Sequence, residues 1–423
     1  MTSVTSARLH DDGLARIPPA DWRIVAGDDR LDLAHPYLAF REHVEPGRPV
    51  ALTLADQHGP AVAVHGALTT PSTALFSHPW KMLTSPQFLR ADERPAEAAA
   101  LRAEHTALIE AVAGPATAPG SGETPAPHLA LSRALGEALV IRGFDSSEVI
   151  RRPDLPPAAR LRASTDLIAA AQDAIRDGLA GAVVLPFVDP GDQELRQVLG
   201  ARGFQQAELT AISLFDLSRH PSYDAFLASM PRDRRYRFRS EPRALETAGL
   251  RLETVRLDDT VERVTELEVA TARKYGGTPR PDALLATRRA MAGLLGHAIR
   301  VPAVRRPDGT IIACGLHLAD GQAYYALVYG CDYGDPERST SYQCVNFYDP
   351  LRYALDNGIR RVRMGFEAFA PKLLRGARLV PRETWLWVPD RRRLEALGRL
   401  LRFLGERCGP YLAALASHHR PPA

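Results

Sequence analysis

Residues 322–384 constrain the fold most, because strands and helices alternate there without a break. The apolar run QAYYALVYG predicts a strand, and a loop rich in Gly, Asp and Ser leads from it into a helix. IRRVRMGFEA predicts a second strand, and APKLLRGAR predicts a short basic helix. Free N–H groups and the helix dipole make the start of a helix an anion site, and a carboxylate beside it can act as a base. The stretch therefore predicts a reaction centre.

The same alternation occurs earlier in the chain. Residues 135–145, 181–189 and 207–217 read as strands, and residues 163–178 and 192–204 read as helices between them. GAVVLPFVD within this series is a continuous apolar run, which is typical of a strand buried on both faces. Strands alternating with helices predict an α/β fold with a mixed sheet. WRIVAGDD, at 22–29, is read as a further short strand.

The two halves of the chain repeat this order, which predicts tandem copies of one fold. We expect a flexible tail over 1–20, a first domain over 21–217, a basic helical connector over 218–249 and a second domain over 250–423 that includes a C-terminal helix.

Composition narrows the class of protein. The chain has 423 residues, 45% of them hydrophobic, and a net charge of +3, so any basic binding surface must be local. No apolar run is long enough to span a membrane, and the N-terminus lacks the apolar core of a signal peptide. The four cysteines show no metal-ligand spacing, so we expect no metal and no tightly bound cofactor. These features predict a cytoplasmic protein of unknown oligomeric state.

Three motifs of the second half carry a resemblance to a known family: YALVYGCD, SYQCVNFYDPLRYALDNG and MGFEAFAPKLLRGARLVP. Their order resembles the GNAT acyltransferase fold. Paired GNAT-like domains, with the basic stretch SMPRDRRYRFRSEPRALETAG before the second, resemble the FemAB-like branch. That branch includes peptidoglycan-bridge aminoacyl transferases and relatives in antibiotic biosynthesis. The first half resembles it only in the order of its elements, so the first domain is expected to be degenerate.

The resemblance implies amide bond formation, in which an acyl or aminoacyl group passes to an amine from coenzyme A or from aminoacyl-tRNA. The usual GNAT donor loop, Arg/Gln-x-x-Gly-x-Gly/Ala, is absent, and CDYGDPERSTSYQ stands in its place. This departure favours aminoacyl-tRNA as the co-substrate and leaves acyl-CoA or a carrier protein as alternative donors.

The candidate catalytic residues form a shortlist. Glu367 follows a strand and a glycine, and Asp332 ends the preceding strand, so either carboxylate is a candidate base. His317 lies among apolar neighbours and is a third candidate, although such a histidine is more often structural. Tyr329 is a candidate proton donor, and the alternative is a core position.

The remaining candidates would bind substrates. Helix-start hydroxyls and a basic short helix are candidates for the donor, and the alternatives are simple capping and a solvated face: Ser339, Thr340, Ser341, Lys372, Arg375 and Arg378. Arginines interleaved with aromatic residues are candidates for contacts with tRNA or phosphate: Arg234, Arg235, Arg237 and Arg239. Trp80, Lys81 and Tyr325 are candidates for the wall of the acceptor pocket.

The sequence thus predicts a transferase that moves an aminoacyl group from aminoacyl-tRNA to a small-molecule amine, either a specialised metabolite or a cell-wall precursor. Attack would be direct, because no G-x-S-x-G nucleophile motif is present. The first alternative is an acyl-CoA-dependent GNAT N-acyltransferase. The second is a non-catalytic ligand-binding protein, for which Glu367→Gln and Asp332→Asn would be silent.

Overall fold

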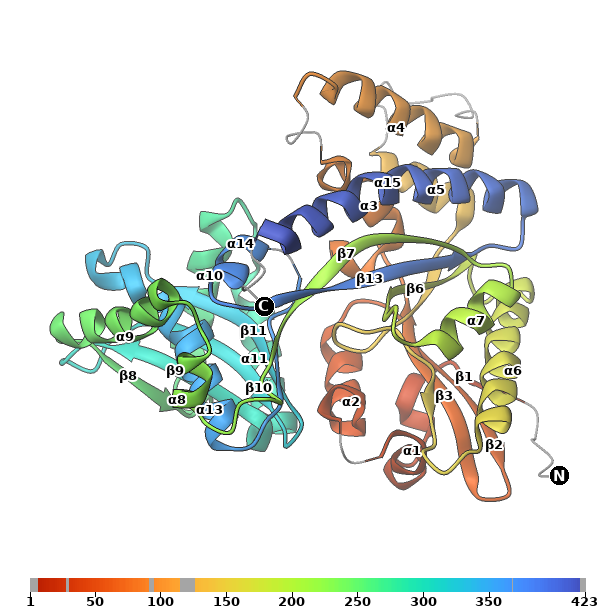
Figure 1. Ribbon diagram of the computed structural model, residues 1–423. Coiled ribbons are helices and arrows are strands. Elements are labelled where there is room, and N and C mark those ends of the chain that lie inside the picture. The colour runs from red at the N-terminus through yellow and green to blue at the C-terminus, as the bar shows by residue number, and fades with distance from the viewer. Residues whose placement is uncertain (1–6, 28–29, 91–94, 115–125, 367, 419–423) are drawn as a thin grey trace. The chain divides into compact units, whose positions relative to one another are not determined.

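The computed structural model describes residues 7–27, 30–90, 95–114, 126–366 and 368–418 (Figure 1). These residues form two compact units. Unit 1 holds residues 1–28, 32–211 and 381–414, and unit 2 holds residues 29–31, 212–380 and 415–423. The α/β fold class with a mixed sheet is confirmed, since antiparallel and parallel strand pairs both occur.

Unit 1 is built on strands β1 (Arg8–His10), β2 (Pro49–Asp56), β3 (Gly59–Leu68), β4 (Ala138–Ile141), β5 (Ile150–Arg151) and β6 (Ala182–Val188). Its α-helices are α1 (Pro19–Ala26), α2 (His35–Val44), α3 (Pro79–Thr84), α4 (Ala98–Ala113), α5 (Pro127–Leu135), α6 (Pro157–Arg176) and α7 (Gln193–Ala201). The short 3-10 turns of this unit are η1 (Gly13–Arg16), η2 (Leu31–Leu33), η3 (Leu75–Ser77) and η4 (Pro86–Leu89).

Alternation along the buried strands sends side chains to two separate cores in unit 1. On one face, Ala182 and Val184 of β6 join the cluster that packs against α3, α4 and α5. On the other face, Val183 and Leu185 join the cluster that packs against α6 and α7. The continuous apolar run predicted as a strand buried on both faces is therefore such a strand, and all seven residues of β6 are buried.

Unit 2 is built on strands β8 (Arg251–Val255), β9 (Ile299–Arg305), β10 (Ile311–Ala319), β11 (Ala323–Cys331) and β12 (Arg361–Arg363). Its α-helices are α8 (Tyr223–Ala228), α9 (Arg232–Thr247), α10 (Val261–Lys274), α11 (Pro281–Leu295), α12 (Ser341–Gln343), α13 (Asp349–Asp356) and α14 (Phe369–Leu374). The 3-10 turns η6 (Gly296–Ala298) and η7 (Pro336–Thr340) and the π-helical turn η8 (Cys344–Tyr348) complete the unit.

Among the described residues, each unit contains one parallel strand pair whose strands are joined through a helix. In unit 1, β4 pairs with β6 and the connection contains α6; in unit 2, β11 pairs with β12 and the connection contains α12 and α13. The order of a strand, two helices, antiparallel strands, a helix, a parallel strand and a short helix occurs in both units, with α3, α4 and α5 inserted between β3 and β4 in unit 1. This repeat is the tandem arrangement that the sequence predicts.

Two long strands, β7 (Gln205–Asp216) and β13 (Arg378–Trp387), contribute to both units. The end of β7 pairs with β12 in unit 2, and the end of β13 pairs with β6 in unit 1. Residues 381–414, which we assigned to the second domain, therefore make their close contacts within unit 1. They include most of the last helix, α15 (Arg391–His418), whose apolar side chains join the core beside α3, α4 and α5.

Two expectations for the N-terminal region differ from the structure. Where a flexible tail was expected, β1 pairs with β2, and Leu14 and Ile17 are buried. WRIVAGDD does not form a strand, because Trp22 and Val25 face the core from α1, three residues apart. Pro19 opens this helix and Gly27, at φ 69°, ends it, and both are helix boundary signals.

Candidate active site

Strand β11 extends past the end of its pairing with β12, because β12 is only 3 residues long. Their parallel pairing ends at Tyr325 opposite Arg363, although β11 continues to Cys331. Residues 326–329 are accordingly half-buried, whereas both ends of β11 are buried. A β-bulge lies in the same stretch, because Val328 pairs with Leu316 and Ala326 with His317, which leaves Leu327 as the extra residue. Bulges re-aim backbone groups and occur often beside active sites.

The loop that follows β12 is fixed by a buried lysine. The ammonium of Lys372 donates to the backbone carbonyl oxygens of Met364 at 2.8 Å and Phe366 at 3.1 Å. The amide of Ser213 on β7 donates to the carbonyl of Gly365 at 3.1 Å. Lys372 is only 5% exposed, so its charge holds this loop in place. Glu367, our first candidate base, lies outside the described residues.

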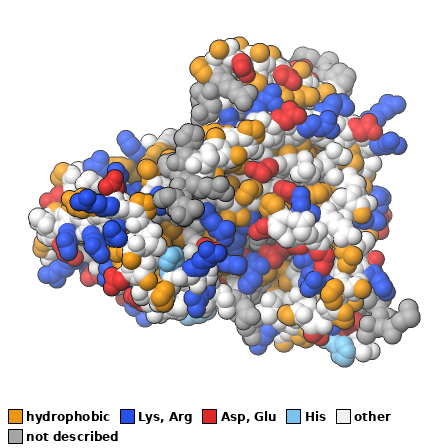
Figure 2. Space-filling model, viewed as in Figure 1, with side chains coloured by type: hydrophobic (Ala, Val, Ile, Leu, Met, Phe, Trp, Pro, Cys, Tyr) orange, Lys and Arg blue, Asp and Glu red, His pale blue; other side chains and the backbone are white. Residues whose placement is uncertain are grey.

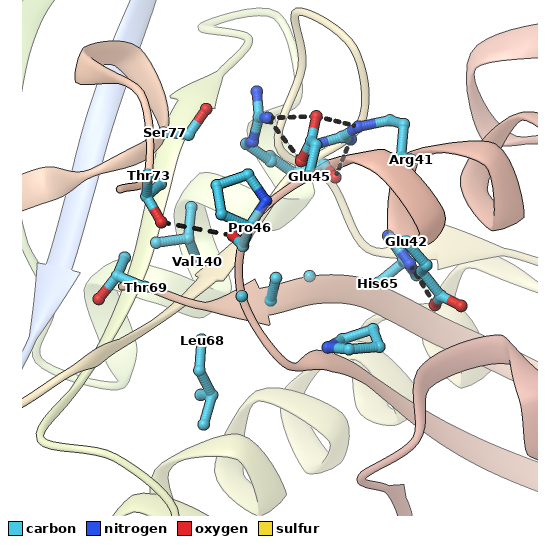
Figure 3. A pocket seen from close by; sticks show the side chains of 15 residues that line it. Arg41, Glu42, Glu45, Pro46, His65, Leu68, Thr69, Thr73, Ser77 and Val140 are labelled. Carbon is cyan, nitrogen blue, oxygen red and sulfur yellow. Dashed lines mark hydrogen bonds and ion pairs between the residues drawn. The ribbon is translucent and has the colours of Figure 1, made fainter. Parts of the chain in front are cut away.

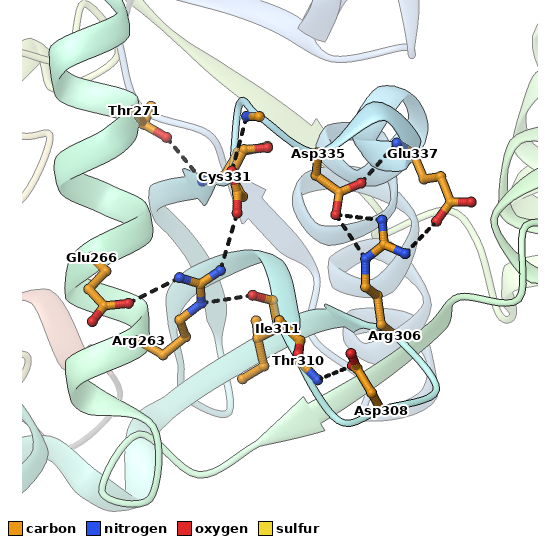
Figure 4. A network of polar contacts seen from close by, with 12 residues as sticks. Arg263, Glu266, Thr271, Arg306, Asp308, Thr310, Ile311, Cys331, Asp335 and Glu337 are labelled. Atoms are coloured by element: carbon orange, nitrogen blue, oxygen red, sulfur yellow. Dashed lines mark hydrogen bonds and ion pairs between the residues drawn. The ribbon is translucent and has the colours of Figure 1, made fainter.

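The helix after β11 begins earlier than we predicted. The carboxylate of Asp335 accepts a hydrogen bond from the amide of Glu337 at 2.9 Å and caps η7 (Figure 4). The Arg306 guanidinium donates to the same carboxylate at 2.8 Å. A carboxylate of the chain itself therefore occupies the place where this helix start would hold an anion.

The three hydroxyls that we expected at the helix start are not its caps, because the helix already begins at Pro336. Ser339 is exposed and Thr340 is half-buried, and neither side chain caps α12. Ser341 is fully buried, and its hydroxyl donates to the carbonyl of Arg338 at 2.6 Å. Simple capping, which was the alternative for these residues, is therefore excluded for η7 and α12, and donor binding by them stays a prediction.

Tyr329, in the half-buried stretch of β11, contacts Ser341. Their hydroxyl oxygens are 2.9 Å apart, and since Ser341 donates to Arg338, the phenol of Tyr329 is the donor to Ser341. The ring of Tyr342 stands edge-on to Tyr329 with the centroids 5.0 Å apart. Burial raises the pKa of the Tyr329 phenol well above 10, so the group stays protonated at neutral pH. Tyr329 is thus a candidate proton donor within the half-buried part of β11.

The two remaining candidate bases differ in their surroundings. Asp332 is half-exposed; it accepts from the amide of Gly334 at 3.0 Å and lies 3.5 Å from the Arg263 guanidinium. His317 is 0% exposed, and its Nε2–H donates to the carbonyl of Val345 in the π-helical turn at 3.0 Å. Burial lowers the pKa of His317 to about 3. These contacts describe a structural histidine and argue against a role as base.

Arg375 and Arg378 lie in different environments. Arg375 is buried, where it contacts Glu241 of α9 at 3.3 Å and lies 5.1 Å from the Phe347 ring. Tyr348 of the π-helical turn donates to the same Glu241 carboxylate. Arg378 is exposed and pairs with Asp216. Arg375 therefore joins α9 to the turn, and only Arg378 is open to a ligand.

The basic helix α9 presents one exposed stripe. Positions 232, 236, 239 and 243 are spaced by four, three and four residues, so they share a face. They are exposed, and the Tyr236 ring is 70% exposed. Figure 2 shows Lys and Arg side chains gathered on this part of unit 2. Of the four arginines predicted for tRNA contact, Arg237 and Arg239 are exposed, whereas Arg234 and Arg235 are half-buried.

The side chains that we predicted for the wall of the acceptor pocket are already engaged in contacts within the protein. Trp80 is fully buried in unit 1 and its indole N–H donates to the carbonyl of Gly136 at 2.9 Å. The ammonium of Lys81 donates to the carbonyls of Pro71 and Thr73, each at 2.7 Å. Tyr325, in unit 2, is 2% exposed. Each of these side chains supports local packing in the unit that contains it.

Sequence reasoning missed Asp335, Arg306 and Glu241. For Asp335 a signal was present: Asp-Pro-Glu at 335–337 combines a capping carboxylate, a proline at the first helical position and an acid in the first turn. Arg306 and Glu241 are distant in sequence from the residues they pair with, so no local pattern indicated them.

Residues 232–372 match the family model of the acetyltransferase (GNAT) domain. The matched segment contains α9, strands β11 and β12, Tyr329 and Lys372. An acyltransferase is thus the class of enzyme that this domain defines. No curated protein matches the chain.

Solved structures of similar fold cover nearly the whole chain. FemX has a TM-score of 0.57 at 10% identity, over 92% of this chain and 100% of that one. A conserved protein of unknown function from Bacteroides thetaiotaomicron has a TM-score of 0.50 at 10% identity, over 89% and 98%. A tandem GNAT protein from the clavulanic acid biosynthesis pathway has a TM-score of 0.47 at 12% identity, over 91% and 99%. The similarity to FemX shows a shared fold.

The helices give no sign of a membrane span. Among the described residues, none combines the length and the apolar character that crossing a bilayer requires.

Proposed function

We propose that the chain transfers an aminoacyl group from aminoacyl-tRNA to the amine of a small molecule. The observation that carries this proposal is the part of β11 that extends past β12, a bulged, half-buried stretch that carries a protonated tyrosine. Acyl transfer needs hydrogen-bond donors near the carbonyl oxygen and a proton for the leaving group. In unit 2, those backbone N–H groups of residues 326–329 that do not pair with β10, together with the Tyr329 phenol, are suited to these two tasks.

The reaction is a direct displacement at an ester carbonyl. The amine nitrogen forms a bond to the carbonyl carbon, and the carbonyl oxygen takes up negative charge. The amine loses one proton to a base, for which Asp332 and Glu367 remain the candidates. The bond to the ribose oxygen then breaks, and Tyr329 supplies a proton to that oxygen. No residue of the enzyme becomes acylated in this scheme, and the four cysteines are buried.

Two observations favour tRNA as the donor. The Asp335 carboxylate occupies the helix start that would otherwise hold a phosphate group. The exposed stripe of α9 combines arginines with an aromatic ring, which suits a phosphate backbone and unstacked bases. The acceptor that we propose is a specialised metabolite or a cell-wall precursor with a free amine.

A second candidate is transfer from acyl-CoA, which the match to the acetyltransferase (GNAT) domain favours. The experiment that separates the two supplies the purified protein with a pool of amines and either charged tRNA or a set of acyl-CoAs. Mass spectrometry then detects acylated amines. We expect products with charged tRNA, and products with acyl-CoA alone would support the second candidate.

A further inference from the structure

The two most exposed of the large apolar and aromatic side chains in the described part of the chain are tyrosines of unit 2. Tyr236 is 70% exposed and Tyr275 is 79% exposed. Both have basic neighbours: Tyr236 lies among the arginines of α9, and Tyr275 follows Arg273 and Lys274 at the end of α10. Exposed aromatic rings beside cations are the platforms on which proteins stack the bases of single strands. Tyr275 is therefore a second candidate platform in unit 2.

Tyr275 contacts a second tyrosine that has two cations beside its ring. Burial raises the pKa of the Tyr333 phenol, and the side chains of Thr271 and Tyr275 form hydrogen bonds with it. The ammonium nitrogen of Lys274 lies 6.0 Å from the centroid of the Tyr333 ring, and the guanidinium carbon of Arg338 lies 5.8 Å from it. An open aromatic ring and two cations therefore meet around Tyr333.

These two cations have no carboxylate partner among the described residues. Arg338 is half-buried, and its Nη1 donates to a backbone oxygen, the carbonyl of Asp335, at 2.8 Å. The nearby carboxylates of Asp335 and Glu337 both pair with Arg306 instead (Figure 4). Lys274 is exposed and forms no ion pair within this part of the chain. Guanidinium and ammonium groups without a carboxylate are suited to the oxygens of a phosphate.

The Arg338 side chain lies near the proposed proton donor. The Ser341 hydroxyl links the two residues, because it accepts from Tyr329 at 2.9 Å and donates to the backbone carbonyl of Arg338 at 2.6 Å. Burial raises the pKa of the Cys331 thiol, and the nearby Arg338 charge opposes this shift. In the proposed transfer, Tyr329 protonates the ribose oxygen of the terminal nucleotide. The phosphate of that nucleotide is attached to the same ribose, so it must bind close to Tyr329.

The charges in the pocket of unit 1 are paired, by contrast. The Glu45 carboxylate accepts from Arg41 at 2.7 Å and from Arg142 at 2.8 Å (Figure 3). The Glu42 carboxylate lies 2.9 Å from Nε2 of His65. Each guanidinium of this pocket already has a carboxylate partner, so unit 1 offers no matching place for a phosphate there.

We propose that Lys274, Tyr275 and Arg338 form a nucleotide subsite, which binds the terminal adenosine nucleotide of the donor. The base stacks on the open Tyr275 ring, and the phosphate pairs with Lys274 and Arg338. The inference rests on the proposed function and adds the group that orients the ester beside Tyr329. The adenine nucleotide of coenzyme A has the same chemistry, so the experiment compares both sources.

The test uses lysine as the reporter, because the chain has only three lysines, Lys81, Lys274 and Lys372. The full chain is labelled with carbon-13 at the lysine Cε atoms, and Lys274→Arg identifies the Lys274 signal. Lys81 and Lys372 donate to backbone carbonyls and are the reference signals. The probes for the subsite are AMP, adenosine and ribose phosphate. The trinucleotide CCA represents the end of tRNA, and coenzyme A represents the other source.

We expect AMP to shift the Lys274 signal in a saturable manner and to leave the two reference signals unchanged. Adenosine and ribose phosphate should each bind at least about tenfold more weakly, because adenosine lacks the charged contacts and ribose phosphate lacks the stacked base. Tyr275→Ala should abolish the preference for AMP over ribose phosphate, and Arg338→Met should abolish most of the preference over adenosine. Arg256→Met, which alters an exposed arginine of the same unit, is the control and should leave both preferences unchanged.

Three results would overturn the proposal: a Lys274 signal that AMP does not shift, equal affinities for AMP and ribose phosphate, or equal affinities for AMP and adenosine. Coenzyme A that binds more tightly than CCA would overturn tRNA as the source of the nucleotide. These comparisons use the unaltered chain, so they do not depend on whether a variant folds. They also need no transfer reaction, so a chain that transfers from tRNA but does not bind AMP contradicts the subsite alone.

Discussion

Asp335 and Arg306 form a closed pair at the start of the helix that follows β11. Two nitrogens of the guanidinium donate to one carboxylate oxygen, at 2.9 and 2.8 Å, and the other oxygen caps the helix. Glu337 pairs with the same arginine at 3.1 Å. Helix starts that bind phosphate leave their N–H groups open, whereas this one is filled by the protein itself.

Asp335→Ala tests the cap. Loss of a capping carboxylate should lower the free energy of unfolding by about 1–2 kcal/mol. Urea unfolding measures this change. Asp335→Asn is the matched control, because its side-chain oxygen can still accept from Glu337. Equal stability of the alanine variant and the unaltered protein would contradict the capping role.

Lys372→Met tests whether the Lys372 ammonium holds the loop after β12 in place. The substitution keeps the length of the side chain but removes the donor to three backbone carbonyls, so it should destabilise the fold by about 1.5–3 kcal/mol. Arg378→Met is the control, since an exposed ion pair contributes less than about 1 kcal/mol. If Lys372 instead bound donor phosphates, stability would be unchanged and only the KM for the donor would rise.

Tyr329→Phe tests the proton donor. We expect kcat to fall by about 100-fold or more, the usual contribution of an acid–base group, with little change in the melting temperature. The raised pKa of the phenol predicts that Tyr329 adds no ionisation to the pH–rate profile near neutrality. Ser341→Ala removes the acceptor of the Tyr329 hydrogen bond and the donor to the Arg338 carbonyl but keeps the phenol, so it should lower kcat less. An unchanged kcat in Tyr329→Phe would remove the phenol from the mechanism.

The pH dependence of stability in His317→Gln distinguishes a structural role of His317 from a catalytic one. The pKa of His317 is about 3 in the folded chain and near 6.5 when unfolded. Between these values the unfolded chain binds the extra proton. The free energy of unfolding therefore has its full value above pH 6.5. It falls by about 1.4 kcal/mol per pH unit as the pH falls from there towards 3.

The glutamine variant should lack this loss, and its activity at pH 7 should stay within a few-fold of the original. Urea unfolding at several pH values compares the two proteins. Parallel stability curves, or abolished activity in a folded variant, would contradict the structural role.

The sequence predicted the order of the elements better than the contacts of their side chains. The spacing of apolar residues and the continuous apolar runs located β6 and β11, because burial on the faces of a sheet leaves a local sequence pattern. Lys372 and Arg375 read as a basic helix face, yet both are buried by contacts that no local pattern encodes. The pairing of β13 with β6 of unit 1 could not be predicted for the same reason, since the sequence pattern of a strand does not specify its partner strand.

Transfer from aminoacyl-tRNA is the central claim, and a labelled transfer assay tests it most directly. The chain is mixed with a radiolabelled aminoacyl-tRNA pool and the amine acceptor found by mass spectrometry, with and without prior treatment of the tRNA by ribonuclease. Arg239→Ala/Arg243→Ala removes charge from the α9 stripe, and Arg391→Ala/Arg392→Ala, two exposed arginines of α15, is the matched control. We predict a labelled amide that ribonuclease abolishes and that only the α9 variant reduces. An equal yield from acyl-CoA in the absence of tRNA would contradict the account.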